Sequence, residues 1–204
     1  MSSTSVSILV PLAGPAPDLP STLETIEHYL QATGFAFDIR VLDRRDGIGY
    51  GAMIRRGAAD AGGSVVIVVD PELPYPVSAI GDAVALIESG AAEVVFGRRE
   101  GCRDSVVLRS LLVPILPDPS LHLKAFSSDA ARLLMAESKL RGGGFDVETA
   151  YLANKYGFRI EQLIVRAEQS RTAFGFWSSL ASAISIRMTD RRNGYRAPRR
   201  CPVC

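Results

Sequence analysis

Two carboxylates follow directly on an uninterrupted apolar run. Residues 65–69 read VVIVV, and Asp70 and Glu72 come next, set among the prolines of the sequence DPELPYP. Acids one residue apart at the end of a buried strand can share a divalent cation, and such a cation can hold a diphosphate while charge builds on a leaving group. Mg²⁺ or Mn²⁺ suits carboxylate ligands of this kind. The other interpretation is a proline-stiffened turn that carries two solvated acids.

Further candidate residues mark the ends of other apolar runs. Pro11 ends the first run and Asp43 ends the second. In an open parallel sheet, ligands bind beyond the carboxyl ends of the strands, which makes these positions candidates together with Asp70. The glycine-rich stretch GIGYGA at 47–52 follows Asp43, and a helix-like segment with Arg55 comes after it.

Strand-like and helix-like segments alternate through the first half of the chain. Short apolar runs predict strands over 5–12, 37–42, 64–69 and 93–97. Apolar residues at helical spacing predict helices over 19–33, 52–61 and 77–89. Strands separated by helices of this length are typical of βαβ units, so we predict a three-layer α/β/α fold with a mostly parallel central sheet.

After residue 97 the pattern is looser. The segments expected there are a helix over 105–115, a short strand over 121–126, helices over 129–137 and 146–156, a strand over 158–165 and a helix over 174–186. Gly157 is expected to end its helix in the left-handed conformation that glycine adopts after a C-cap.

Composition narrows the class of protein. With 47% hydrophobic and 22% charged residues, the 204-residue chain is an ordinary globular sequence, and a net charge of +1 gives no reason to expect a nucleic-acid partner. No window approaches the roughly 18 apolar residues of a membrane span, and the N-terminal stretch does not read as a signal peptide. Three cysteines form no disulfide framework, so we expect a cytoplasmic protein.

The end of the chain differs from the rest. Residues 187–200 carry six arginines, and a CPVC sequence follows at 201–204. We expect one domain over 1–188 and a basic tail over 189–204, which could link to a zinc-binding module in a longer chain. Helix 174–186 and the arginine-rich stretch 187–200 form the candidate surface for peripheral membrane contact. The alternative is that the helix packs into the core and the tail is a solvated linker.

Six short motifs occur in the order in which one enzyme family carries them. They read GIGYGA at 47–52, DPELPYP at 70–76, GRR at 97–99, DPSLHLK at 118–124, FDVE at 145–148 and SR at 170–171. In this order they resemble the motifs of inverting glycosyltransferases of family two, which have the GT-A fold. The similarity is greatest to the dolichyl- or polyprenyl-phosphate sugar synthases, and it covers about residues 6–186.

The resemblance implies an activity and a role for each residue. The activity is transfer of a sugar from a nucleoside diphosphate sugar to an acceptor, with inversion, and the implied acceptor is a polyprenyl phosphate. The implied roles are metal binding by Asp70 and Glu72, catalysis by these two and Asp146, nucleotide binding by Pro11, Asp43, Gly49 and Arg55, and phosphate binding by Arg99, Lys124 and Arg171. Asp146 could instead only cap its helix.

The sequence also departs from the family pattern. The family follows its first strand with Tyr-Asn-Glu, whereas Leu12, Ala13 and Gly14 stand here, and the second acid of the metal motif is Glu72 rather than Asp. These departures leave a second hypothesis from another class. It is a catalytically inactive GT-A-like module that binds a nucleotide or a partner protein.

Overall fold

The central element is one six-stranded sheet. In the computed structural model of the chain, residues 4–12, 14–43, 48–101, 121, 123–167, 176–192 and 194–195 are described. The strands are β1 (Ser5–Leu12), β2 (Ala36–Asp43), β3 (Val65–Val68), β4 (Val94–Arg99), β5 (Lys124–Ser127) and β6 (Ile160–Val165). Their order across the sheet is β2-β1-β3-β5-β4-β6, and every neighbouring pair is parallel except those that β5 makes. The predicted mostly parallel sheet is therefore confirmed.

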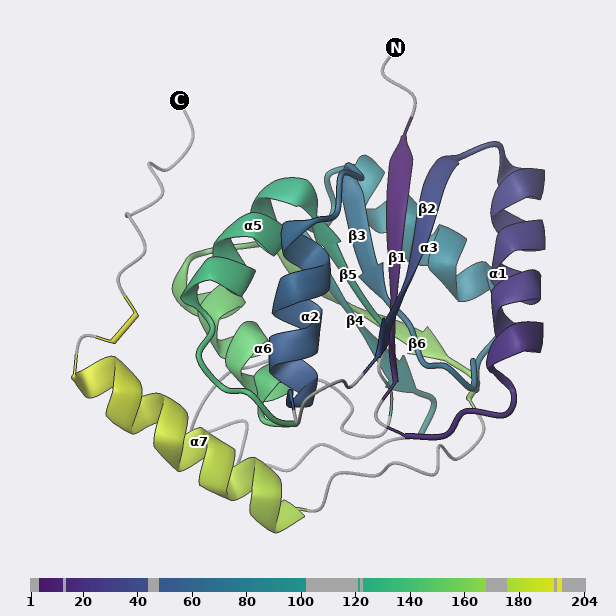
Figure 1. The fold of residues 1–204 in the computed structure, drawn as a ribbon. Coiled ribbons are helices and arrows are strands. Elements are labelled where there is room, and N and C mark those ends of the chain that lie inside the picture. The colour runs from purple at the N-terminus through teal and green to yellow at the C-terminus, as the bar shows by residue number, and fades with distance from the viewer. Residues whose placement is uncertain are drawn as a thin grey trace.

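Helices cover both faces of this sheet (Figure 1). They are α1 (Leu19–Thr33), α2 (Tyr50–Ala59), α3 (Ser78–Glu88), α5 (Ser128–Glu137), α6 (Phe145–Lys155) and α7 (Phe176–Arg191). The α1 and α3 helices lie on one face, whereas α2, α5 and α6 lie on the other, with α7 outside α6. This arrangement is the predicted three-layer α/β/α fold.

Strand alternation divides the core into two halves. Val6 and Ile8 of β1 pack on the α1/α3 side, and Leu9 packs with Val66 and Phe96 on the α2/α5/α6 side. Because both faces of the inner strands are covered, β1 and β3 are apolar at most positions. The fully buried run Val65–Val68 is the clearest case.

Local signals set the helix ends. Pro20 stands in the first turn of α1, where its missing N–H costs nothing, and Gly34 ends that helix with φ of 73°. Gly157 follows α6 with φ of 74°, as its position in the sequence predicts. The last helix continues to Arg191, five residues beyond the expected end, and Tyr195 is buried in the core. The expected helix over 105–115 lies outside the described residues.

No helix among the described residues is both long enough and apolar enough to cross a membrane.

Candidate functional site

The corner after β3 places the two acids that the sequence singles out. Asp70 is buried, with 2% of its surface exposed, whereas Glu72 is exposed. The Asp70 N–H donates to the Tyr75 hydroxyl at 3.2 Å, and the Leu73 N–H donates to the Asp70 carbonyl at 3.2 Å. Leu73 has φ of 43°, a left-handed conformation that a leucine rarely adopts. Such strain is concentrated at functional sites, which supports a role for this corner beyond turning the chain.

A buried ion pair lies on the α2/α5/α6 side of the same edge of the sheet. The Lys124 Nζ contacts the Asp146 carboxylate at 2.9 Å and the Tyr50 hydroxyl at 3.3 Å. The side chain of Lys124 is 1% exposed and that of Asp146 is 8% exposed. Water therefore contributes little to stabilising these charges, and the two side chains compensate each other. Asp146 thus faces Lys124 of the sheet from the first turn of α6.

The tyrosines link the ion pair to the β3 corner. Burial raises the pKa of Tyr50 well above its usual value, and the charges of Asp146 and Asp70 raise it further. Burial also raises the pKa of Tyr75, again with a contribution from Asp70. Both phenols are therefore neutral near pH 7, and, besides burial, the charges of Asp146 and Asp70 both raise the pKa of Tyr50.

The predicted nucleotide-binding residues lie around α2 and the end of β1 and β2. Pro11 is buried in β1 opposite Leu42, and Asp43 is exposed at the end of β2. Asp43 also lines a cavity of 340 Å³ together with Ile48 and Arg56. These positions share the carboxyl edge of the sheet with the β3 corner.

Gly49 and Arg55 contact the loop between α5 and α6. Gly49 precedes α2 and leaves no room for a Cβ beside the Arg141 carbonyl. The Arg55 Nη1 donates to the Leu140 carbonyl at 2.8 Å. In this structure the Arg55 guanidinium therefore holds a loop of the protein.

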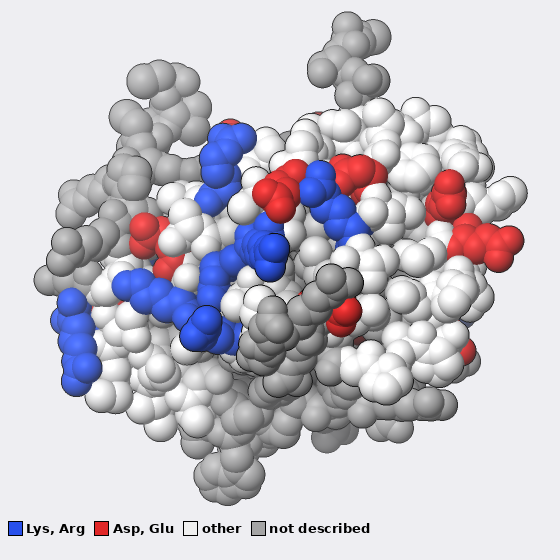
Figure 2. All heavy atoms as spheres, in the orientation of Figure 1, with Lys and Arg blue, Asp and Glu red and all other residues white. Residues whose placement is uncertain are grey.

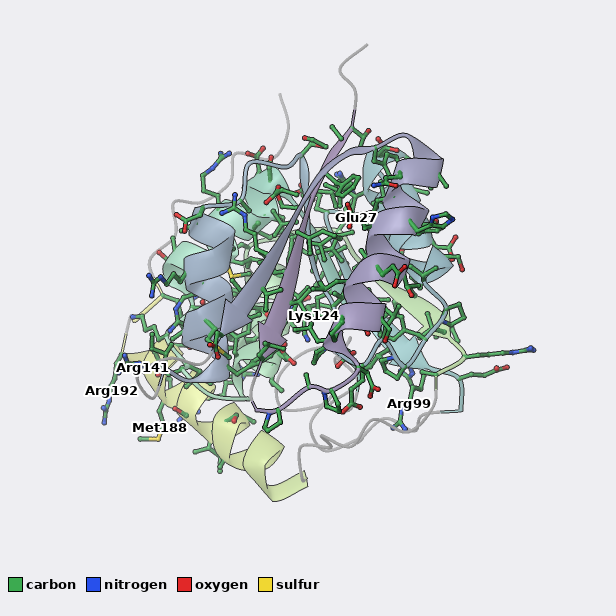
Figure 3. The ribbon with its side chains drawn as sticks, turned by 45° about the vertical axis from the view of Figure 1, so that its right-hand side comes forward. Glu27, Arg99, Lys124, Arg141, Met188 and Arg192 are labelled. Atoms are coloured by element: carbon green, nitrogen blue, oxygen red, sulfur yellow. The ribbon has the colours of Figure 1, made fainter. Side chains whose placement is uncertain are left out.

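The predicted phosphate-binding cations are not brought together. Lys124 is paired with Phe96 across β5 and β4, so its side chain lies on the α2/α5/α6 side. Arg99 is three residues beyond Phe96 in β4, and strand alternation puts its side chain on the opposite face. Figure 3 shows Arg99 at the edge of the molecule and Lys124 in its interior. Arg171 lies outside the described residues.

A second, larger cavity lies beside the β3 corner and is lined in part by residues 72–76. It has a volume of 990 Å³, and its lining includes Asp18, Glu72, Glu100 and Arg166. Glu72 therefore faces a space large enough for a small ligand. Sequence reasoning did not single out Asp18, Glu100 or Arg166, since none of them belongs to one of the six motifs.

The metal prediction can be compared with the donor groups present. Among the described residues no group of three or more His, Cys, Asp or Glu side chains is placed to hold a metal ion. Mg²⁺ and related hard cations often use only one or two protein carboxylates, because water and substrate phosphates complete their coordination. Asp70 and Glu72 are such a pair by residue type and position in the sequence, but Asp70 is buried whereas Glu72 is exposed and lines the 990 Å³ cavity.

Solved structures similar to this chain include sugar-transferring enzymes. Glucosyl-3-phosphoglycerate synthase from Mycobacterium tuberculosis, in complex with Mn²⁺, UDP and phosphoglyceric acid, matches with a TM-score of 0.69 at 16% identity, over 96% of this chain and 80% of that chain. Mannosyl-3-phosphoglycerate synthase from Rubrobacter xylanophilus matches with a TM-score of 0.70 at 14% identity, over 98% and 79%. The catalytic domain of Drosophila beta1,4galactosyltransferase 7, in complex with xylobiose, matches with a TM-score of 0.57 at 13% identity, over 86% and 73%.

At these identities the likeness establishes the fold. The chain has the GT-A fold, which confirms the predicted architecture. No protein-family model matches the sequence, and no curated protein matches it.

Proposed function

We propose that this protein is a glycosyltransferase that takes a sugar from a nucleoside diphosphate sugar. The observation that carries the proposal is the β3 corner, where Asp70 and Glu72 follow a buried strand at the carboxyl edge of a GT-A sheet. Similar structures with bound UDP and Mn²⁺ support the same class of donor and a divalent cofactor, Mg²⁺ or Mn²⁺. A working enzyme is also favoured over the inactive module, because the neighbours with named activities are transferases.

The charge distribution supports an anionic donor. Figure 2 shows Lys and Arg side chains gathered over the face that α2 covers, and acidic side chains toward α1. Arg56 of α2 is exposed and lines the cavity beside Asp43. Positive potential beside a cleft raises the local concentration of an anionic ligand such as a nucleoside diphosphate sugar.

In the proposed reaction, an acceptor oxygen forms a bond to the anomeric carbon of the sugar as the bond from that carbon to the diphosphate breaks. The diphosphate leaves with the electron pair of that bond, and a hydroxyl acceptor releases its proton to solvent. A divalent ion held by Asp70 and Glu72 would neutralise charge on the departing diphosphate. Asp43, Pro11 and Gly49 are the candidates for contact with the nucleotide. Asp146 is the candidate acceptor-facing carboxylate, and Lys124 would compensate its charge in the buried site.

The positions of the site residues say less about the acceptor than about the donor. The resemblance implies a polyprenyl phosphate, with Arg99, Lys124 and Arg171 as the residues that bind phosphate, but Arg99 and Lys124 lie on opposite faces of the sheet. We therefore propose the acceptor only as a hydroxyl or phosphate compound. Phosphoglycerate and a short polyprenyl phosphate are the two acceptors to compare first.

Calorimetry with UDP, GDP and dTDP in Mn²⁺ and in EDTA tests the proposal. We expect one nucleotide to bind at least about tenfold more tightly in Mn²⁺, and Asp70→Asn to abolish that gain, since the amide lacks the carboxylate charge. Asp82→Asn, an exposed acid on α3, is the matched control and should bind like wild type. Absence of binding by all three nucleotides in Mn²⁺ would contradict the proposed donor class.

A further inference from the structure

Glu148 is a fully buried acid that no part of the proposed reaction uses. It lies in α6, with 0% of its surface exposed. Its carboxylate accepts hydrogen bonds from the N–H of Lys139 at 3.0 Å, from the N–H of Leu140 at 2.8 Å and from the Tyr195 hydroxyl at 2.6 Å. Burying a carboxylate is unfavourable unless hydrogen-bond donors stabilise its charge. These three donors therefore contribute to holding Glu148 in its buried position.

One donor to Glu148 comes from the C-terminal side of α7. The ring of Tyr195 is buried and packs near Tyr151, with ring centroids 6.4 Å apart. The Lys139 Nζ lies 5.4 Å from the centre of the Tyr195 ring, and this ammonium also donates to the Gly194 carbonyl. Asp190 in α7 accepts from both the Tyr151 hydroxyl and the Lys155 ammonium, which fixes the end of α7 against α6.

The other donors belong to the loop between α5 and α6, and this loop holds the start of α2. The N–H groups in the first turn of a helix have no partner within the helix. Gly49 at the N-cap of α2 has no side chain to supply one, and the Gly51 N–H instead donates to the Arg141 carbonyl at 2.8 Å. Arg55 adds its hydrogen bond to the Leu140 carbonyl.

The start of α2 carries Tyr50, and Tyr50 belongs to the candidate site. Its hydroxyl accepts from Lys124, the partner of Asp146, and its ring lies edge-on against Phe145 at a centroid distance of 6.3 Å. A continuous series of contacts therefore runs from Tyr195 through Glu148 and the loop to Tyr50.

We propose that Glu148 and Tyr195 form a clasp that positions the first turn of α2, and with it Tyr50, at the nucleotide-binding edge. Both are positioning residues, since they act through the loop of residues 138–144. The expected effect of the clasp on nucleotide affinity rests on the proposed function, whereas its effect on the start of α2 does not. If the clasp positions Tyr50, the candidate site requires the chain as far as Tyr195.

The test uses the full chain with Tyr195→Phe, which removes only the hydroxyl. We expect amide hydrogen exchange to quicken about tenfold at Leu140 and at Gly51, since one hydrogen bond is worth about a factor of ten in an opening equilibrium. The matched control is Tyr156→Phe, which also removes a tyrosine hydroxyl that donates to a carboxylate, that of Glu137 at 3.1 Å. Exchange at Gly51 should not change in this control.

A second readout is the affinity for the nucleotide that the wild-type protein binds in Mn²⁺. Tyr195→Phe should weaken it about five- to tenfold, while Tyr156→Phe leaves it unchanged even if both variants lower the melting temperature equally. Unchanged exchange at Gly51 in Tyr195→Phe overturns the clasp, as does an equal increase in the control. If Tyr195→Phe fails to fold, Glu148→Gln is measured in its place against the same criteria. If no nucleotide binds the wild type, the proposed function fails, while hydrogen exchange still decides on the clasp.

Discussion

Lys124 is the residue whose surroundings differ most from its expected role. The resemblance implies that Lys124 binds a phosphate group of a ligand. In the structure its ammonium is buried and contacts Asp146 and Tyr50 instead. A buried ion pair is strongly destabilised when one partner is removed, because the other charge stays in a medium of low polarity. The pair therefore ties the stability of the fold to the candidate site.

Lys124→Met tests this coupling. The substitution keeps much of the side-chain volume and removes the charge that compensates Asp146, so we expect a loss of about 3–5 kcal/mol in the free energy of unfolding. Urea denaturation at neutral pH measures it.

Two further variants show whether the loss of stability in Lys124→Met is caused by the unpaired buried charge. Arg132→Met breaks the exposed pair with Asp129 and should change stability by less than about 1 kcal/mol. The double variant Lys124→Met/Asp146→Leu should recover most of the loss, since no uncompensated charge remains. A double variant as unstable as the single one would show that packing, rather than charge, explains the effect.

The start of α2 depends on close contact between two backbones. A Cβ on Gly51 would lie 2.5 Å from the Leu140 carbonyl oxygen and 2.7 Å from the Cβ of Phe145. Neither of these atoms belongs to the flexible end of a side chain, so the helix or the loop would have to shift.

We expect Gly51→Ala to destabilise the protein by about 1–3 kcal/mol, the usual cost of inserting a methyl group into a packed region. Gly142→Ala in the same loop is the control, because a Cβ there meets nothing within 4 Å. Thermal unfolding followed by circular dichroism compares the two variants. Equal melting temperatures would mean that the loop gives way easily, and would also weaken the case for the clasp.

Elements with strong local signals could be predicted from the sequence. The apolar run of β1 and the proline and glycine that bound α1 are such signals, and both elements have the predicted limits, Ser5–Leu12 and Leu19–Thr33. β5 has no comparable signal. It is four residues long, it contains a lysine, and its direction is set by the neighbours it joins rather than by its own pattern.

The candidate site was predictable to the same extent. Asp70 and Glu72 stand out because an apolar run ends beside them. The burial of Lys124 depends on Asp146, 22 residues later in the chain. That Arg99 and Lys124 lie on opposite faces of the sheet depends on the register between β4 and β5. Both are consequences of tertiary pairing, which no local pattern carries.

The outer surface of α7 bears on how the whole molecule could meet a membrane. Ile184 and Met188 are exposed there, at 54% and 49%, and Arg187, Arg191 and Arg192 are exposed beside them. Figure 3 shows Met188, Arg192 and Arg141 at the same end of the molecule. Exposed apolar side chains among arginines are what an anionic bilayer surface attracts, so peripheral contact remains a prediction for this face.

Sedimentation with vesicles that contain phosphatidylserine tests the prediction at low and high salt. Each arginine near such a surface contributes about 1 kcal/mol, so Arg191→Ser/Arg192→Ser should weaken binding about 30-fold. The control Arg132→Ser/Arg159→Ser removes the same charge from exposed positions elsewhere and should bind like wild type. If the wild-type chain never sediments, or if both variants lose binding equally, this face is no membrane surface.

The position of β5 has a consequence for the nascent chain on the ribosome. β3 and β4 are joined in the sheet only through β5, although β5 leaves the ribosome last of the three. At roughly 5–20 residues per second, the ribosome needs on the order of seconds to add the residues between β4 and the end of β5. During that delay the β3 edge and the apolar residues Val94–Phe96 of β4 lack the strand that pairs with them in the described part of the fold. We expect this interval to be the one in which the growing chain depends most on chaperones that shield strand edges.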